Sequence, residues 1–122
     1  MTNDQSPKRH IFDLEQRTTE FAKQVIRLCK ALPRNPINDR LVGQIAGSAG
    51  SVGANYREAN DALGKKDFVH RMKISRKEAK ETIHWLELIE EANAEFKLMV
   101  EPLAKEADEL KKILSAIIDK CR

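Results

Sequence analysis

The chain has 122 residues, of which 41% are hydrophobic and 34% are charged, and this length suits a single domain. The composition excludes a disordered or low-complexity protein, because enough apolar side chains are present to form a core. With four Phe, one Tyr and one Trp, the chain also lacks the aromatic residues for an extended base-stacking platform.

Residues 1–11 are mostly polar and include Pro7, and we expect them to form a disordered leader. They lack the apolar segment of a secretory signal peptide. No stretch of the chain approaches the roughly 18 apolar residues of a membrane span. We therefore expect a cytoplasmic protein without a membrane partner.

Four amphipathic helices are expected between residues 12 and 122. The first follows Asp13, a candidate N-cap, and ends at Pro33. The second is expected to run from Asn38, as its cap, to Gly64, as its C-terminal stop. The apolar seam of the first helix repeats at steps of four and three, and consists of Leu14, Thr18, Phe21, Val25, Leu28 and Leu32.

The third helix is expected to start near Asp67 and to end where Asn93–Glu95 interrupts the apolar pattern. Pro102 fits the first turn of a fourth helix, or Phe96–Val100 adds an earlier turn. Long helices joined by short loops favour an all-α, antiparallel up-down-up-down four-helix bundle over residues 12–122.

Four of the five glycines recur at steps of four, three and three within the second helix, which places them on one side of it. This glycine stripe consists of Gly43, Gly47, Gly50 and Gly53. Each glycine costs roughly 1 kcal/mol relative to alanine in a helix interior. We expect a second backbone to pack closely against the stripe, because that contact can offset the cost.

Charge is segregated along the chain. Residues 65–81 carry seven basic and three acidic side chains, whereas residues 82–110 carry eight acidic and two basic ones. In an antiparallel bundle the start of the third helix and the end of the fourth lie together, and that end is expected to be basic. Its basic residues would be Lys65, Lys66, Arg71 and Lys73 with Lys111, Lys112, Lys120 and Arg122.

The segment from Gln44 to Glu87 contains unusual strings, which include Gly53-Ala54-Asn55-Tyr56-Arg57-Glu58, Asp67-Phe68-Val69-His70-Arg71-Met72-Lys73-Ile74 and Trp85-Leu86-Glu87-Leu88. Over most of its length the chain resembles the bacterial four helix bundle family, also called the 23S ribosomal RNA intervening-sequence proteins. The resemblance implies a ring-shaped homopentamer. It also implies a relation to accessory proteins of diversity-generating retroelements, which bind a reverse transcriptase and nucleic acid.

Of the polar residues that match the family motif, five are candidates for one polar cluster, namely Asn55, Arg57, Glu58, Glu78 and Glu81, and Lys73 is the sixth match. They form either a functional pocket or an interhelical polar network that fixes the register of the helices, and we favour the network. The specific expectation is a salt bridge from Arg57 to Glu78 or Glu81.

Seven basic residues are candidates for contact with nucleic-acid phosphates, namely Lys65, Lys66, Arg71, Lys73, Arg76, Lys77 and Lys80. Clustered lysines and arginines suffice for non-specific binding. For one subunit, a solvated helix face neutralised by nearby acids is the simpler interpretation. A ring repeats the patch and multiplies weak contacts, so we expect salt-sensitive, sequence-tolerant binding of RNA or DNA by the oligomer only.

Patterns for catalysis or metal binding are weak. Glu81 and His84 have the Glu-x-x-His spacing of di-metal bundles. The second histidine of such a site is missing, because His70 lies on the same helix and cannot face the same metal pair. Cys29 and Cys121 are expected at opposite ends of the bundle, too far apart for a disulfide. We expect no cofactor, no metal and no enzymatic activity.

The sequence thus predicts a non-enzymatic, homo-oligomeric bundle that acts as a binding or assembly module. Its expected partners are further copies of itself, and RNA, DNA or a reverse transcriptase at the basic end. The alternative is a structural or protein-interaction ring without a nucleic-acid role. A metal-dependent enzyme is the third and least supported class.

Overall fold

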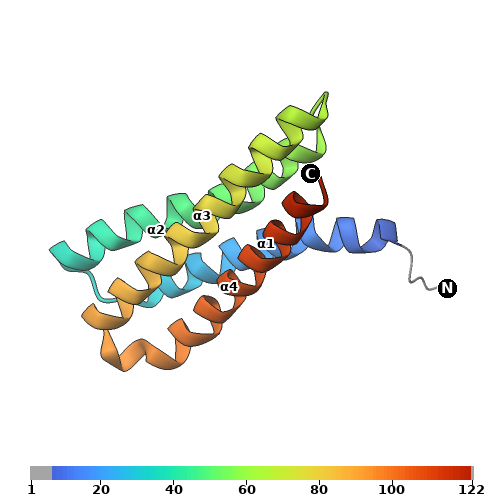
Figure 1. The fold of residues 1–122 in the computed structure, drawn as a ribbon. Coiled ribbons are helices and arrows are strands. Elements are labelled where there is room, and N and C mark those ends of the chain that lie inside the picture. The colour runs from blue at the N-terminus through green and yellow to red at the C-terminus, as the bar shows by residue number, and fades with distance from the viewer. Residues whose placement is uncertain (1–6, 122) are drawn as a thin grey trace.

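The computed structural model describes residues 7–121, with side chains described from residue 14 onward. Its four long helices are α1 (Pro7–Ala31), α2 (Pro36–Asn60), α3 (Lys65–Ala92) and α4 (Lys97–Lys120), and a 3₁₀ turn, η1 (Ala94–Phe96), precedes α4. Consecutive helices pack side by side, and α1 closes the bundle against α4 (Figure 1). The described chain is therefore the antiparallel four-helix bundle expected from the sequence.

The two ends of the bundle are distinct. The α1–α2 and α3–α4 connections lie at one end, and the α2–α3 connection lies at the other end with the C-terminus (Figure 1). The α2–α3 pair makes the most extensive contact and the α1–α4 pair the least extensive.

Two helices begin earlier than the sequence suggested. The first helix starts at Pro7 and not after Asp13, so the expected leader is helical from residue 7, and its residues 1–6 lie outside the described part. The second helix starts at Pro36, because Asn35 and not Asn38 is its N-cap. The Asn35 side chain accepts a hydrogen bond from the backbone nitrogen of Asn38 at 2.8 Å. Pro36 at the first helical position loses no intrahelical bond.

The remaining helix ends also differ from expectation. Helix α2 ends at Asn60, and Gly64 instead precedes α3, which begins at Lys65. Helix α4 begins at Lys97, so Pro102 lies inside it. The alternative of an earlier turn over residues 96–100 is thus what the structure shows.

The apolar seams form one core between the four helices. The expected seam of α1 is buried along its whole length, including Thr18, and the seam of α3 is buried from Met72 to Ile89. Along α4 the last buried position is Ile118 and not Ile117, which is half-buried. Burying apolar side chains at every turn is the main stabilising contribution to such a bundle.

Among the described residues, the glycine stripe makes close contact with another helix at one position only. A Cβ atom at Gly53 would lie 2.9 Å from the Thr18 hydroxyl oxygen on α1, so only glycine fits there without a shift. At Gly43, Gly47 and Gly50 an added Cβ would meet nothing within 4 Å. These three glycines lie on the exposed side of α2, and their helix-propensity cost is not offset by packing inside the chain.

A buried pair of amides ties the two connections at one end of the bundle together. Asn38 and Asn93 exchange two side-chain hydrogen bonds of 2.9 Å each. Asn38 also donates to the Pro33 carbonyl at 2.9 Å, and Asn93 donates to the Ile89 carbonyl at 3.0 Å. Every donor of both amides is thereby used, as a buried polar group requires. Sequence reasoning missed this pair, because it treated Asn38 as a helix cap.

Candidate nucleic-acid interface

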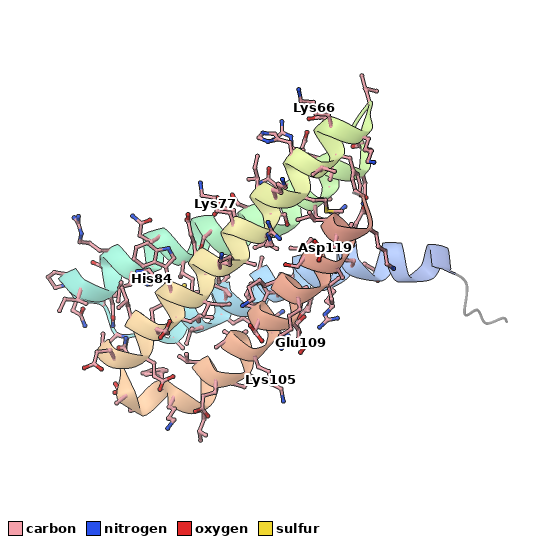
Figure 2. All side chains as sticks on the ribbon, in the orientation of Figure 1. Lys66, Lys77, His84, Lys105, Glu109 and Asp119 are labelled. Atoms are coloured by element: carbon pink, nitrogen blue, oxygen red, sulfur yellow. The ribbon has the colours of Figure 1, made fainter. Side chains whose placement is uncertain are left out.

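Helix α3 presents a continuous basic face to solvent. Its opposite face is buried against the core, which fixes the rotation of the helix about its axis. The outward positions recur at steps of four and three and are all exposed, namely Lys66, His70, Lys73, Lys77, Lys80 and His84. We call these six residues the α3 basic stripe. At 1.5 Å per residue the stripe is about 27 Å long, and Figure 2 shows Lys66, Lys77 and His84 following one another along the helix.

The positive charges of the lysines in the stripe are not neutralised by ion pairs with described acidic residues. Among the described residues, neither Lys65 nor any lysine of the stripe forms an ion pair. Two shallow hollows follow the helix surface. The first is lined by Lys65, Lys66, Val69, His70 and Lys73. The second is lined by Lys73, Arg76, Lys77, Lys80, Glu81 and His84. The stripe can therefore attract an extended polyanion along its length.

Four of the seven predicted basic residues belong to the stripe, Lys65 lies beside its first residue, and two arginines turn away from it. Arg71 turns towards α2 and donates to the Asn55 side-chain oxygen at 3.3 Å. Arg76 turns towards α4 and donates to the Ser115 hydroxyl at 3.3 Å. The other five, all lysines, are exposed. His70 and His84 belong to the stripe but were not among the predicted contacts, although their spacing could have revealed them.

The contribution of α4 to a basic end is smaller than expected. Lys111 and Lys112 both pair with Asp108, at 3.0 and 3.1 Å. These two lysines lower the pKa of the Asp108 carboxyl by hydrogen bonding to it. Lys120 is exposed, and Arg122 lies outside the described residues. The basic surface is therefore better described as a face of α3 than as one end of the bundle.

The predicted salt bridge from Arg57 to Glu78 or Glu81 is wrong. Arg57 lies on the side of α2 that faces α1, four residues after Gly53, and pairs with Glu15 at 3.1 Å. It also donates to the Thr19 hydroxyl at 3.2 Å. The prediction failed because successive side chains of a helix point about 100° apart, and the sequence alone does not show whether Arg57 faces α1 or α3.

The five polar residues of the family motif do not form one network. Asn55 accepts from Arg71, whereas Arg57 belongs to the α1–α2 contact, and Glu58 and Glu81 are exposed. Glu78 is half-buried. Burial raises the pKa of the Glu78 carboxyl, and the charge of Glu81 raises it further. The buried polar contacts between α2 and α3 come from hydroxyl groups that the sequence did not single out.

These hydroxyl contacts fix the register of α2 against α3. The Ser75 hydroxyl donates to the Val52 carbonyl at 2.7 Å. A hydrogen bond of 2.9 Å joins the hydroxyl groups of Thr82 and Ser48. All three side chains are buried, and a slip of either helix would break both contacts between the two helices. This contact sets where α3, and with it the α3 basic stripe, lies along α2.

No catalytic arrangement is apparent in the described part of the chain. Glu81 and His84 are both exposed on α3. Among the described residues, no group of three or more His, Cys, Asp or Glu side chains is placed to hold a metal ion. Cys29 and Cys121 are free thiols, each half-buried. None of the described helices combines the length and the apolar character needed to cross a membrane.

Comparisons with known proteins agree with the fold. A family model described as 23S rRNA-intervening sequence protein matches residues 12–116. The chain is also similar to a crystal structure of a protein of unknown function from the S23 ribosomal protein family of Bacteroides thetaiotaomicron. The two share 33% sequence identity with a TM-score of 0.76, over 86% of this chain and 97% of that chain. No curated protein matches. The family match covers most of the bundle, and the chain belongs to the 23S rRNA-intervening sequence protein family.

Proposed function

We propose that the protein is a non-enzymatic, homo-oligomeric binding module whose α3 basic stripe binds the phosphate backbone of RNA or DNA. The observation that carries this proposal is the row of unpaired lysines at Lys66, Lys73, Lys77 and Lys80, joined at its start by Lys65. A pentamer is the assembly that the family resemblance implies. A reverse transcriptase remains the protein partner that the same resemblance implies.

The stripe suits phosphates better than bases. Its side chains are four lysines and two histidines, and it contains no Phe, Tyr or Trp for base stacking. Lysine acts on phosphate mainly as a point charge, which carries no sequence information. Binding is therefore expected to tolerate any sequence and to weaken with salt.

The salt dependence follows from the number of lysines. If all five contact phosphates of a duplex, the slope of log K against log salt is about −4.5, at 0.9 per neutralised phosphate. Affinity then falls about 500-fold between 50 and 200 mM salt. Oligomerisation repeats the stripe on each subunit, which raises the overall affinity for a long nucleic acid.

The test is a salt titration of binding to a duplex of arbitrary sequence. Lys73→Gln/Lys77→Gln is expected to reduce the slope by about 1.8, at 0.9 per lysine. The matched control is Lys111→Gln/Lys112→Gln, because Asp108 already pairs with these two lysines. The proposal fails if wild-type protein at micromolar concentration and low salt forms no complex. It also fails if the control weakens binding as much as the stripe variant.

A second candidate is an assembly or protein-interaction ring that binds no nucleic acid. The observation that favours it is the exposed part of the glycine stripe, Gly43, Gly47 and Gly50, because no described side chain or neighbouring helix lies within 4 Å of a Cβ atom added there. Sedimentation that shows an oligomer, together with no binding in the salt titration, would select this candidate over the first.

A further inference from the structure

Exposed apolar side chains gather in two segments at one end of the bundle. The structure exposes six large apolar side chains among its described residues, and five of them lie in these segments. Ile26 and Ile37, 50% and 64% exposed, belong to residues 23–43 around the α1–α2 connection, which we call the groove segment. Leu88, Leu98 and Met99, 38%, 86% and 42% exposed, belong to residues 87–101, which we call the corner segment.

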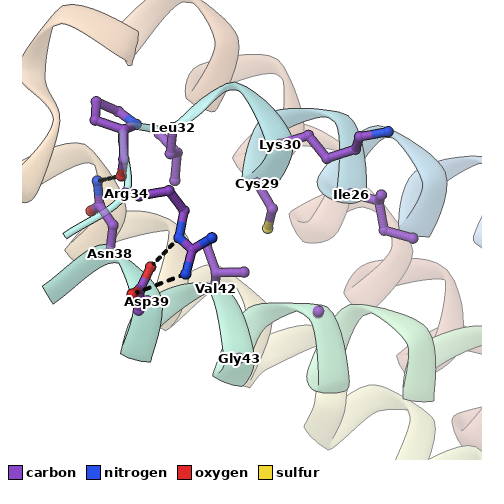
Figure 3. Close-up of a pocket in the computed structure, with 11 residues that line it drawn as sticks. Ile26, Cys29, Lys30, Leu32, Arg34, Asn38, Asp39, Val42 and Gly43 are labelled. Carbon is purple, nitrogen blue, oxygen red and sulfur yellow. Dashed lines mark hydrogen bonds and ion pairs between the residues drawn. The ribbon is translucent and has the colours of Figure 1, made fainter. Parts of the chain in front are cut away.

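The groove segment contains a hollow between α1 and α2. Its volume is about 660 Å³. Ile26 and Cys29 line it from α1, and Val42, Gly43 and Ala46 line it from α2 (Figure 3). Because Gly43 has no side chain, the backbone of α2 is accessible at the edge of the hollow. The hollow is thus open and largely apolar, and of the exposed glycines Gly43 borders it.

Arg34 and Asp39 sit at the mouth of this hollow and neutralise each other. Their side chains form an ion pair, with the Arg34 Nε atom 2.8 Å from the Asp39 Oδ1 atom (Figure 3). Lys30 lines the hollow as well and contributes a charge that this pair does not cancel. The rim of the hollow is therefore positive.

The two segments carry opposite charge. The groove segment has five basic residues and one acidic residue, whereas the corner segment has five acidic residues and one basic residue. Within the described chain no ion pair joins the segments, because Arg34 pairs with Asp39 and Lys97 pairs with Glu101. Glu87, Glu90 and Glu91 instead surround a surface hollow of their own. Each segment therefore has the charge that would attract the other segment in a second molecule.

We propose that the corner segment of one copy of the chain docks into the α1–α2 groove of the next copy. This inference rests on the proposed homo-oligomer and names its interface. The exposed Leu98 and Met99 would fill the apolar hollow at Ile26 and Cys29. The glutamates of the corner segment would lie against the basic rim of the groove.

The geometry of the bundle favours a ring for copies joined in this way. The groove lies on the α1–α2 edge and the corner on the α3–α4 edge, so the contact joins two different surfaces and is heterologous. Both surfaces lie at the same end of the bundle (Figure 1). Successive copies therefore shift little along the bundle axis, which favours a closed ring over a filament.

Disulfide trapping tests the contact. In a Cys29→Ser/Cys121→Ser background, Ile26→Cys/Leu98→Cys places one thiol in the groove and one on the corner. Mild oxidation is expected to give a covalent ladder that extends beyond the dimer and disappears on reduction. The matched control is Ile26→Cys/Leu63→Cys, because Leu63 is fully exposed but lies at the other end of the bundle. This control should give no ladder.

The outcomes separate this inference from the proposed function. A product that stays monomeric or stops at the dimer overturns the heterologous contact, and so does an equal ladder in the control. Sedimentation of the wild-type protein under reducing conditions is measured in parallel. If the wild type is an oligomer but the trap fails, only the docking mode is refuted. If it sediments as the 13.9 kDa monomer, both the docking mode and the proposed assembly are refuted.

Discussion

Two glycines on one helix allow a matched test of how α2 packs. Gly53→Ala places a methyl group 2.9 Å from the Thr18 hydroxyl oxygen and 3.2 Å from the Thr18 Cβ atom. Thr18 is fully buried, and its hydroxyl donates to the Glu15 carbonyl at 3.0 Å. A β-branched side chain held in this way cannot move aside cheaply. Gly50→Ala makes the same change on the same helix but meets open space.

The expected effects have opposite signs. Both substitutions gain roughly 1 kcal/mol of helix propensity, since alanine replaces glycine in a helix interior. At Gly53 overpacking costs about 1–3 kcal/mol, so the net effect is neutral or destabilising by up to about 2 kcal/mol. At Gly50 the added methyl group meets open space, so no overpacking opposes the gain in helix propensity. We therefore expect Gly53→Ala to be less stable than Gly50→Ala by about 2 kcal/mol, the middle of the overpacking range.

Urea unfolding of both variants, with thermal melting as a second measurement, checks this difference. For a domain of this size 1 kcal/mol corresponds to roughly 4 °C in Tm. Equal stability of the two variants would refute the close approach of α2 to α1 at Gly53. Sedimentation should accompany the unfolding, because a Gly50→Ala variant that assembles less well would show that the exposed glycines pack against another copy.

Three further predictions concern side chains that the bundle buries. Asn38→Ala and Asn93→Ala should each cost about 1–3 kcal/mol in urea unfolding, because each leaves a buried amide without its partner. The double variant should cost less than the sum, and strict additivity would contradict the pairing. Because burial raises the pKa of Glu78, the folded wild type loses stability as pH rises through that raised pKa. Glu78→Gln should therefore raise Tm at pH 7.5, and the gain should vanish below about pH 4.3, the ordinary Glu pKa; a gain independent of pH would argue against this account. Burial also raises the pKa of the Cys29 thiol, so alkylation of Cys29 should be slower in folded protein than in urea, and equal rates would contradict its burial.

The fold could be predicted from the sequence because it depends on a repeating pattern. Apolar residues at steps of three and four specify which face of each helix is buried, and that pattern survives small errors in helix length. The helix ends were predicted less well. Asn38 has the residue type of a cap, but a partner 55 positions away claims its side chain. Such a long-range pairing leaves no local signal in the sequence.

The candidate site was likewise predicted from the sequence only in part. The lysines of the stripe were identified because charge clustering is visible in a linear sequence. The salt bridge predicted for Arg57 is wrong, and Arg71 and Arg76 lie off the stripe, because the placement of each side chain depends on the rotation of its helix and changes by about 100° per residue. Arg57 pairs with α1, whereas Arg71 and Arg76 bond to α2 and α4. Burial of the opposite face of each helix fixes that rotation.

The α3 basic stripe and the exposed glycines lie on the most extensively packed pair of helices. The pair α2 and α3 carries both the exposed glycines and the α3 basic stripe, and buried hydroxyl bonds lock its register. The α1–α4 contact is the least extensive of the contacts between helices. A bidentate ion pair between Arg17 on α1 and Glu106 on α4, with bonds of 2.7 and 2.9 Å, bridges it. Local opening follows the regions with the fewest packed contacts, so it should begin between α1 and α4. Such opening would leave the spacing of the lysines along α3 unchanged. The α3 basic stripe would therefore keep the geometry that we propose for phosphate binding.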